Sequence, residues 1–172
     1  MTLMAVVFAI TANAQYNVGT SSRYTDSYGN SISTHRNQYG QTTGTSSSYT
    51  DGYGYTTTTH RDRYGNSLGT STTYTDIYGY TTTTHRDRYG NTTGTAKSYT
   101  DSNGNTSTTY SDSYGRNRGL SNTYRDSYGN TTTTYRNNLG QSIGSSSSYT
   151  DSSGYTTTQQ RSYNSNTSIW SW

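Results

Sequence analysis

The chain has 172 residues and a formal net charge of +3, with 12 Lys and Arg against 9 Asp and no Glu. Small hydroxyl side chains dominate, with 38 Thr and 28 Ser beside 18 Gly and 21 Tyr, and there is no Cys or Pro. Few aliphatic residues follow Gln15, which excludes the apolar core of an ordinary globular enzyme, and the lack of Cys excludes disulfides and thiol chemistry.

Residues 1–14 have the pattern of a signal peptide. An apolar run from Leu3 to Ile10 is followed by small residues that end in Ala12-Asn13-Ala14, an A-x-A cleavage site before Gln15. The run is too short to cross a bilayer as a helix, and no Lys or Arg precedes it, so the basic end of the signal is missing. We expect an exported bacterial protein, extracellular or at the cell surface, without a membrane span.

Residues 24–160 are tandem repeats with a period of 25 residues. The consensus is Y-T-D-x-Y-G-[NY]-T-T-T-T-[HY]-R-[DN]-x-Y-G-[NQ]-x-x-G-T-S-x-x. Residues 15–23 are a partial repeat, because Gly19 matches Gly44 of the first full unit, and residues 161–172 are predicted to be a degenerate C-terminal cap. The first residue of each unit is a tyrosine: Tyr24, Tyr49, Tyr74, Tyr99, Tyr124 and Tyr149.

Each unit carries the same turn twice, with Asp in its first position and Gly in its fourth. This pattern predicts a type I turn followed by a left-handed Gly, which closes a three-residue hairpin loop. Thr-rich runs such as 56–61 and 70–75 lie between the turns and predict strands. The predicted turn residues are Asp26, Gly29, Asp51, Gly54, Asp62, Gly65, Asp76, Gly79, Asp87, Gly90, Asp101, Gly104, Asp126 and Gly129.

These elements predict an all-β protein built as an antiparallel array of β-hairpins. An odd period would turn each new unit's side chains to the opposite face, so one β-bulge per repeat is required. A β-solenoid with one coil per repeat is the alternative, since stacked coils need no bulge. The predicted bulge residues are the mid-strand glycines Gly44, Gly69, Gly94, Gly119 and Gly144.

The segment Tyr124-Arg125-Asp126-Ser127-Tyr128-Gly129-Asn130-Thr131-Thr132 resembles the YD repeats of bacterial Rhs-type surface and toxin-delivery proteins. Those repeats follow a Y-x-D-x-x-G-[RN]-x-T pattern, and the resemblance, which spans residues 24–160, implies β-hairpins. Here the period is longer, Thr and Ser replace most apolar residues, and six units are too few for the family's enclosing shell. The general plan also resembles curli-type subunits, without the curli Ser/Gln/Asn spacing.

The sequence predicts no enzyme, no cofactor and no metal site. His35, His60 and His85 share one repeat position and are weak metal candidates, but no second ligand type accompanies them, so a solvated strand face is expected. Each Asp stands alone at a turn, unlike the clustered carboxylates of a calcium site. A net charge of +3, with Lys97 as the single Lys, argues against nucleic acid as a partner.

Self-association is the leading functional expectation. Polar strands of uniform sequence with little core gain most by adding neighbours edge to edge, which favours a homopolymer in fibres or a biofilm matrix layer. The alternative is a monomeric adhesin that binds cell-surface glycans, and an ice-binding protein is a lesser alternative. In both of the first two cases the face formed by the six first-position tyrosines is the contact surface.

Overall fold

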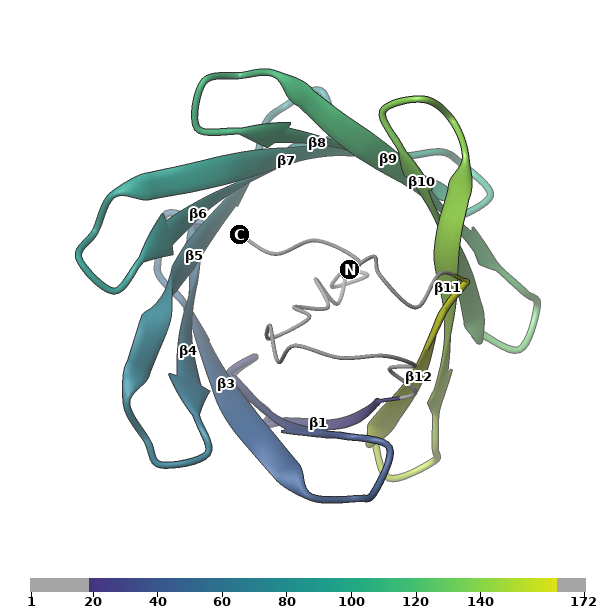
Figure 1. Cartoon of the computed structure of the whole chain (residues 1–172). Coiled ribbons are helices and arrows are strands. Elements are labelled where there is room, and N and C mark those ends of the chain that lie inside the picture. Colours follow the sequence, from purple (N-terminus) through teal and green to yellow (C-terminus); the bar gives the residue numbers. More distant parts are fainter. Residues whose placement is uncertain (1–18, 164–172) are drawn as a thin grey trace.

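Twelve antiparallel strands form one closed barrel in the computed structural model, which describes residues 19–163 (Figure 1). Each strand pairs with its neighbours in the chain, and β1 pairs with β12 to complete the circle. No helix in these residues is long and apolar enough to cross a membrane. The strands are β1 Thr20–Thr25, β2 Ser31–Arg36, β3 Thr42–Thr50, β4 Thr56–Asp62, β5 Ser67–Thr75, β6 Tyr80–Asp87, β7 Thr92–Thr100, β8 Thr106–Asp112, β9 Asn117–Arg125, β10 Thr131–Asn137, β11 Ser142–Thr150 and β12 Thr156–Ser162.

The turns between strands have one repeated geometry. In the turn that joins β3 to β4, the Gly54 amide donates to the Asp51 carbonyl over 3.1 Å, and the Asp51 amide donates to the Tyr55 carbonyl over 2.9 Å. The Asp51 carboxylate accepts the amides of Tyr53 and Tyr55, and Gly54 has a φ of 85°. Asp or Asn begins every such turn because its side chain satisfies two amides that the strands leave unpaired.

A register shift occurs once in each repeat, opposite the predicted bulge glycines. On β4, His60 pairs with Gly69 but Arg61 pairs with Ser67, so Leu68 is the extra residue. A side chain at Gly69 would overlap the carbonyl oxygen of Arg86, and its φ of 138° disfavours other residues. The same shift lies beside Gly44, Gly94, Gly119 and Gly144.

Neither predicted architecture is right: the antiparallel pairing of consecutive strands excludes the β-solenoid, and the open hairpin array is wrong about how the sheet ends. The hairpins and their antiparallel pairing are present, but the sheet closes on itself. Strand β1, which includes the end of the partial repeat, lies beside β12 as β5 lies beside β4. Ser21 pairs with Thr158 in the same way that Ser71 pairs with Thr58. Closure satisfies the edge hydrogen bonds that an open array would leave to solvent.

The buried faces of the strands form a polar core. Alternate residues on every strand point into the barrel, and the buried hydrophobic residues among those described are Ala96, Tyr110, Tyr135 and Ile143. Pairs of hydroxyl groups form hydrogen bonds between neighbouring strands on this inner face, for example Ser98 with Thr108 at 2.9 Å and Thr123 with Thr133 at 2.8 Å. A core of this kind is stable only because nearly all of its polar atoms have partners. The predicted signal peptide at 1–14 and residues 164–172 lie outside the described part of the chain.

Candidate functional site

A row of histidines and serines runs inside the barrel across β2 to β6. Ser46 Oγ lies 2.9 Å from both His35 Nε2 and His60 Nδ1. Ser71 Oγ lies 3.0 Å from both His60 Nε2 and His85 Nδ1. Each hydroxyl can donate to one ring and accept from the other, so neutral imidazoles in one common tautomer form a continuous hydrogen-bonded chain.

Burial makes these histidines weak bases. Desolvation, with smaller contributions from the charges of His35 and His85, lowers the pKa of His60 to about 4. Desolvation also lowers the pKa of His85 to about 4 and lowers that of His35. The row is therefore neutral at physiological pH and loses that state only in acid.

The histidines do not lie on the solvated strand face that the sequence predicts, and that prediction is wrong. The bulge in each repeat keeps the same positions on the concave face, so the histidines lie inside the barrel, where His60 and His85 are buried. Among residues 19–163, no group of three or more His, Cys, Asp or Glu side chains is arranged to hold a metal ion.

Tyrosine occupies the same interior position in the next two units. Tyr110 bonds Ser121 at 3.0 Å, and Tyr135 bonds Ser146 at 3.1 Å, each through its hydroxyl group. Burial raises the pKa of both phenols, which keeps them neutral. Each ring faces a bulge glycine on the next strand, Gly119 for Tyr110 and Gly144 for Tyr135, just as His60 faces Gly69.

The six first-position tyrosines point outward and encircle the barrel beside one set of turns. Tyr155 lies 5.4 Å from Tyr24 between ring centroids, Tyr55 lies 4.7 Å from Tyr74, and Tyr80 lies 5.2 Å from Tyr99. We call this set the tyrosine collar: Tyr24, Tyr49, Tyr55, Tyr74, Tyr80, Tyr99, Tyr124, Tyr149 and Tyr155. All nine are exposed, which leaves a band of aromatic surface on the outer wall.

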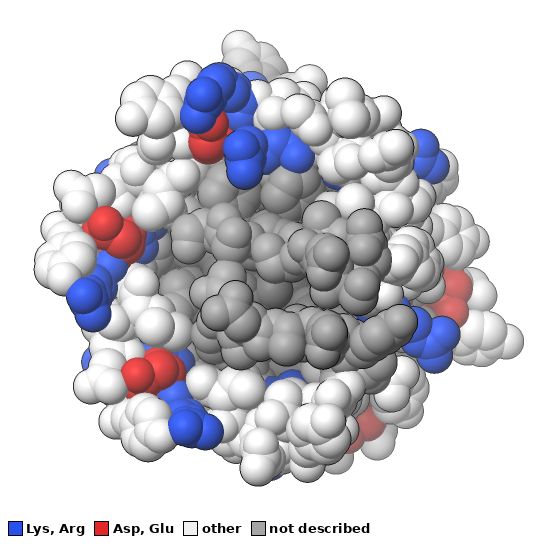
Figure 2. Space-filling view, viewed as in Figure 1, with Lys and Arg blue, Asp and Glu red and all other residues white. Residues whose placement is uncertain are grey.

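The two ends of the barrel differ in charge. The acidic end is the set of turns that begin at Asp26, Asp51, Asp76, Asp101, Asp126 and Asp151. The basic end is the set of turns 37–40, 62–65, 87–90, 112–115 and 137–140, where arginines surround the opening (Figure 2). Its nine arginines, all exposed, are Arg36, Arg61, Arg63, Arg86, Arg88, Arg116, Arg118, Arg136 and Arg161.

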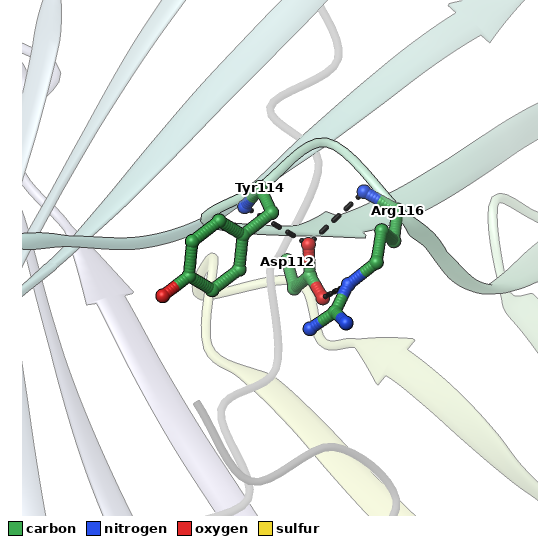
Figure 3. A network of polar contacts seen from close by, with 3 residues as sticks. All are labelled: Asp112, Tyr114 and Arg116. Carbon is green, nitrogen blue, oxygen red and sulfur yellow. Dashed lines mark hydrogen bonds and ion pairs between the residues drawn. The ribbon is translucent and has the colours of Figure 1, made fainter.

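Arginines at the basic end are held by their own turns. Arg116 Nε lies 2.7 Å from Asp112 Oδ2, and the same carboxylate accepts the amides of Tyr114 and Arg116 (Figure 3). The guanidinium group also lies 5.1 Å from the centroid of the Tyr114 ring. Arg63 and Arg88 stack on Tyr64 and Tyr89 in the same way, at 4.6 and 4.7 Å.

Three features of these sites escaped sequence reasoning. Tyr55, Tyr80 and Tyr155 complete the collar, and a signal was available because they share one repeat position after the turn. The serines that bridge the histidines also share one repeat position, but serine is so common in this chain that the pattern does not distinguish them from other serines. The separation of arginines from aspartates could have been found by assigning each repeat position to one end of an up-and-down sheet.

Comparison of the chain with models of protein families, with curated proteins and with solved structures found no significant match.

Proposed function

We propose that the protein is an exported binding module that holds cell-surface or matrix glycans on the tyrosine collar. Its activity is binding, without a catalytic step. The observation that supports it is the set of nine exposed tyrosines around the outer wall, six of which form three ring pairs across neighbouring strands. Tyrosine rings stack on the apolar faces of sugars, and their hydroxyl groups bond sugar hydroxyls.

The surroundings of the collar suit a neutral, hydroxyl-rich ligand. Exposed threonines such as Thr57 and Thr82 lie next to the collar on the outer wall, and the Lys97 ammonium nitrogen lies 4.8 Å from the centroid of the Tyr80 ring. The neighbouring Asp turns add acceptors for sugar hydroxyl groups. A long glycan can therefore contact several repeats at once and gain affinity by multivalency.

The closed sheet argues against the two other expected functions, edge-to-edge fibres and ice binding. Within residues 20–162 every strand has two neighbours, so the bare edges that favoured fibres built edge to edge are missing. The outward threonine rows lie on a curved wall, whereas a match to an ice lattice requires a flat one. Fibre formation through sheet edges and ice binding therefore have less structural support than glycan binding on the tyrosine collar.

A glycan array and retention on insoluble polysaccharides test the proposal. We expect Tyr55→Ala/Tyr74→Ala and Tyr80→Ala/Tyr99→Ala, combined in one variant, to weaken glycan binding by about tenfold or more. The matched control is Tyr64→Ala/Tyr89→Ala, which removes tyrosines from the basic end and should bind like the wild type. A wild-type protein that binds no glycan, or a collar variant that binds as tightly as the wild type, would overturn the proposal.

A further inference from the structure

The two ends of the barrel carry opposite charge, as counted over the described residues. The basic end has nine exposed arginines and only three aspartates, Asp62, Asp87 and Asp112. The acidic end has six turn aspartates, and the cations near it are the half-buried Arg23 and Arg125 and the exposed Lys97, which contacts Tyr80. The charge of the protein is therefore separated along the barrel axis, although its net charge is only +3.

Hydrogen bonds favour the ionised form of three carboxylates at the acidic end. Side-chain bonds from Asn30, Asn105 and Asn130, followed by bonds from the turn amides, lower the pKa of Asp26, Asp101 and Asp126. These three carboxylates are consequently charged at neutral pH, and they lie at the opposite end of the barrel from the nine arginines.

Large apolar side chains project from both ends as well. The acidic end exposes Tyr28, Tyr53, Ile77, Tyr78 and Tyr128, of which Tyr128 is 89% exposed. The basic end exposes Tyr39, Tyr64, Tyr89, Tyr114 and Leu139, of which Tyr114 is 83% exposed. Exposed aromatic side chains beside arginines are typical of the centres of protein interfaces.

We propose that the barrel binds a second copy of itself end to end, with the basic end of one copy seated on the acidic end of the next. Both ends are built by the same 25-residue repeat, so charged turns recur around the two ends with the same spacing. A copy placed coaxially can thus set several arginine-bearing turns against several aspartate-bearing turns. Because the two contacting surfaces differ, the contact repeats and produces open stacks rather than closed dimers.

This contact uses the ends and not the collar, so it does not depend on the proposed glycan binding. It also differs from the edge-to-edge fibre, because no backbone hydrogen bond between copies is required. An anionic polymer is the competing occupant of the basic end, but it would leave the acidic end and its exposed tyrosines unexplained.

Sedimentation velocity of the full chain over a range of concentrations tests the stacking. We expect large, concentration-dependent species at about 20 mM salt and mainly monomers at about 0.5 M salt, because salt screens charges that meet in water. A chain that stays monomeric at low salt, including one that instead binds heparin or DNA through its arginines, would overturn the proposal.

Charge exchange between equivalent turn positions makes the test specific. Arg63→Asp/Arg88→Asp removes positive charge from two adjacent turns of the basic end, and Ser102→Arg/Ser127→Arg adds it at the same turn position on two adjacent turns of the acidic end. Each variant alone should associate about tenfold or more weakly, whereas an equimolar mixture should stack again, since each altered end then meets a complementary one.

The control is Lys97→Glu/Asn122→Glu, which changes charge on the exposed outer wall and should stack like the wild type. Far-UV circular dichroism establishes that each variant keeps its sheet. Separate variants that assemble as well as the wild type, or a mixture that fails to restore assembly, would contradict end-to-end docking.

Discussion

Two arcs of the barrel wall place different rings at the same interior position of the repeat. From β2 to β6 the ring is a histidine, and Ser46 and Ser71 each bridge two histidines into one chain. In β8 and β10 the ring is a tyrosine, and Ser121 and Ser146 each bond a single phenol. Both rings lie opposite a bulge glycine. Five of the six units therefore place a flat ring with a polar end at this position, with Gln160 in the sixth, and only the histidine arc adds groups that become protonated in acid.

The largest difference between the two arcs is expected in acid, where protonation of the histidines lowers the stability of the barrel. The pKa of His60 and of His85 is about 4 in the folded barrel, against 6.5 for an unperturbed histidine. Between pH 6.5 and pH 4 the histidines of the unfolded chain bind more protons than those of the folded barrel. The contribution of the two neutral histidines to the free energy of unfolding is therefore complete above pH 6.5 and is lost as the pH falls towards 4. The loss is about 3 kcal/mol for each of the two histidines.

Chemical unfolding at several pH values measures this loss. His35→Tyr/His60→Tyr/His85→Tyr extends the tyrosine arc around the barrel and should make the free energy of unfolding nearly constant from pH 7 to pH 4.5. A triple variant that loses as much stability in acid as the wild type would show that other groups carry the effect.

The glycine opposite each ring is the feature that the two arcs share. Gly69→Ala places a side chain against the carbonyl oxygen of Arg86 at a φ of 138°, and should cost about 3 kcal/mol or more. Gly52→Ala is the control, because its side chain would enter open space and Gly52 does not have a positive φ. Thermal unfolding of the two variants measures the difference, and equal melting temperatures would contradict the close approach of the backbones.

Substitution of the bridging serines should show that a serine in the histidine arc holds two rings, whereas a serine in the tyrosine arc holds one. Ser71→Ala removes the partner of two buried ring nitrogens and should cost about 2 kcal/mol, whereas Ser121→Ala removes that of one phenol and should cost about 1 kcal/mol. Denaturant unfolding at pH 7.5 compares the two. A larger cost at Ser121 would mean that the histidine chain is not cooperative.

The smallest effect is expected within the tyrosine arc. Tyr135→Phe keeps the ring and loses only the hydroxyl bond to Ser146, at a cost of about 1 kcal/mol. Tyr128→Phe, at an exposed turn position, should leave stability unchanged. If both variants are neutral in denaturant unfolding, the phenol hydroxyl groups contribute nothing and the ring alone holds the position.

The local structure could be predicted from the sequence because its causes are local. The Asp-to-Gly turn pattern places hairpin loops wherever Asp51-Gly54 and its equivalents occur, and the β-branched runs between them are the strands. The odd period requires a bulge, and the register shifts lie at Gly44, Gly69, Gly94, Gly119 and Gly144, where that requirement puts them. In these steps a few neighbouring residues decide the geometry.

The tertiary structure alone decided which face of the sheet is interior and where the charges gather. Thr20 and Gln159 are 139 positions apart, and their pairing closes the barrel; no local pattern reports a contact at that separation. Closure makes one face concave, which buries the histidine row and leaves the first-position tyrosines outside. It also brings all turns of one kind to the same end, so arginines scattered through the sequence become one basic end. The sequence determined the strands, turns and bulges by local chemistry, whereas burial and charge separation follow from one long-range pairing.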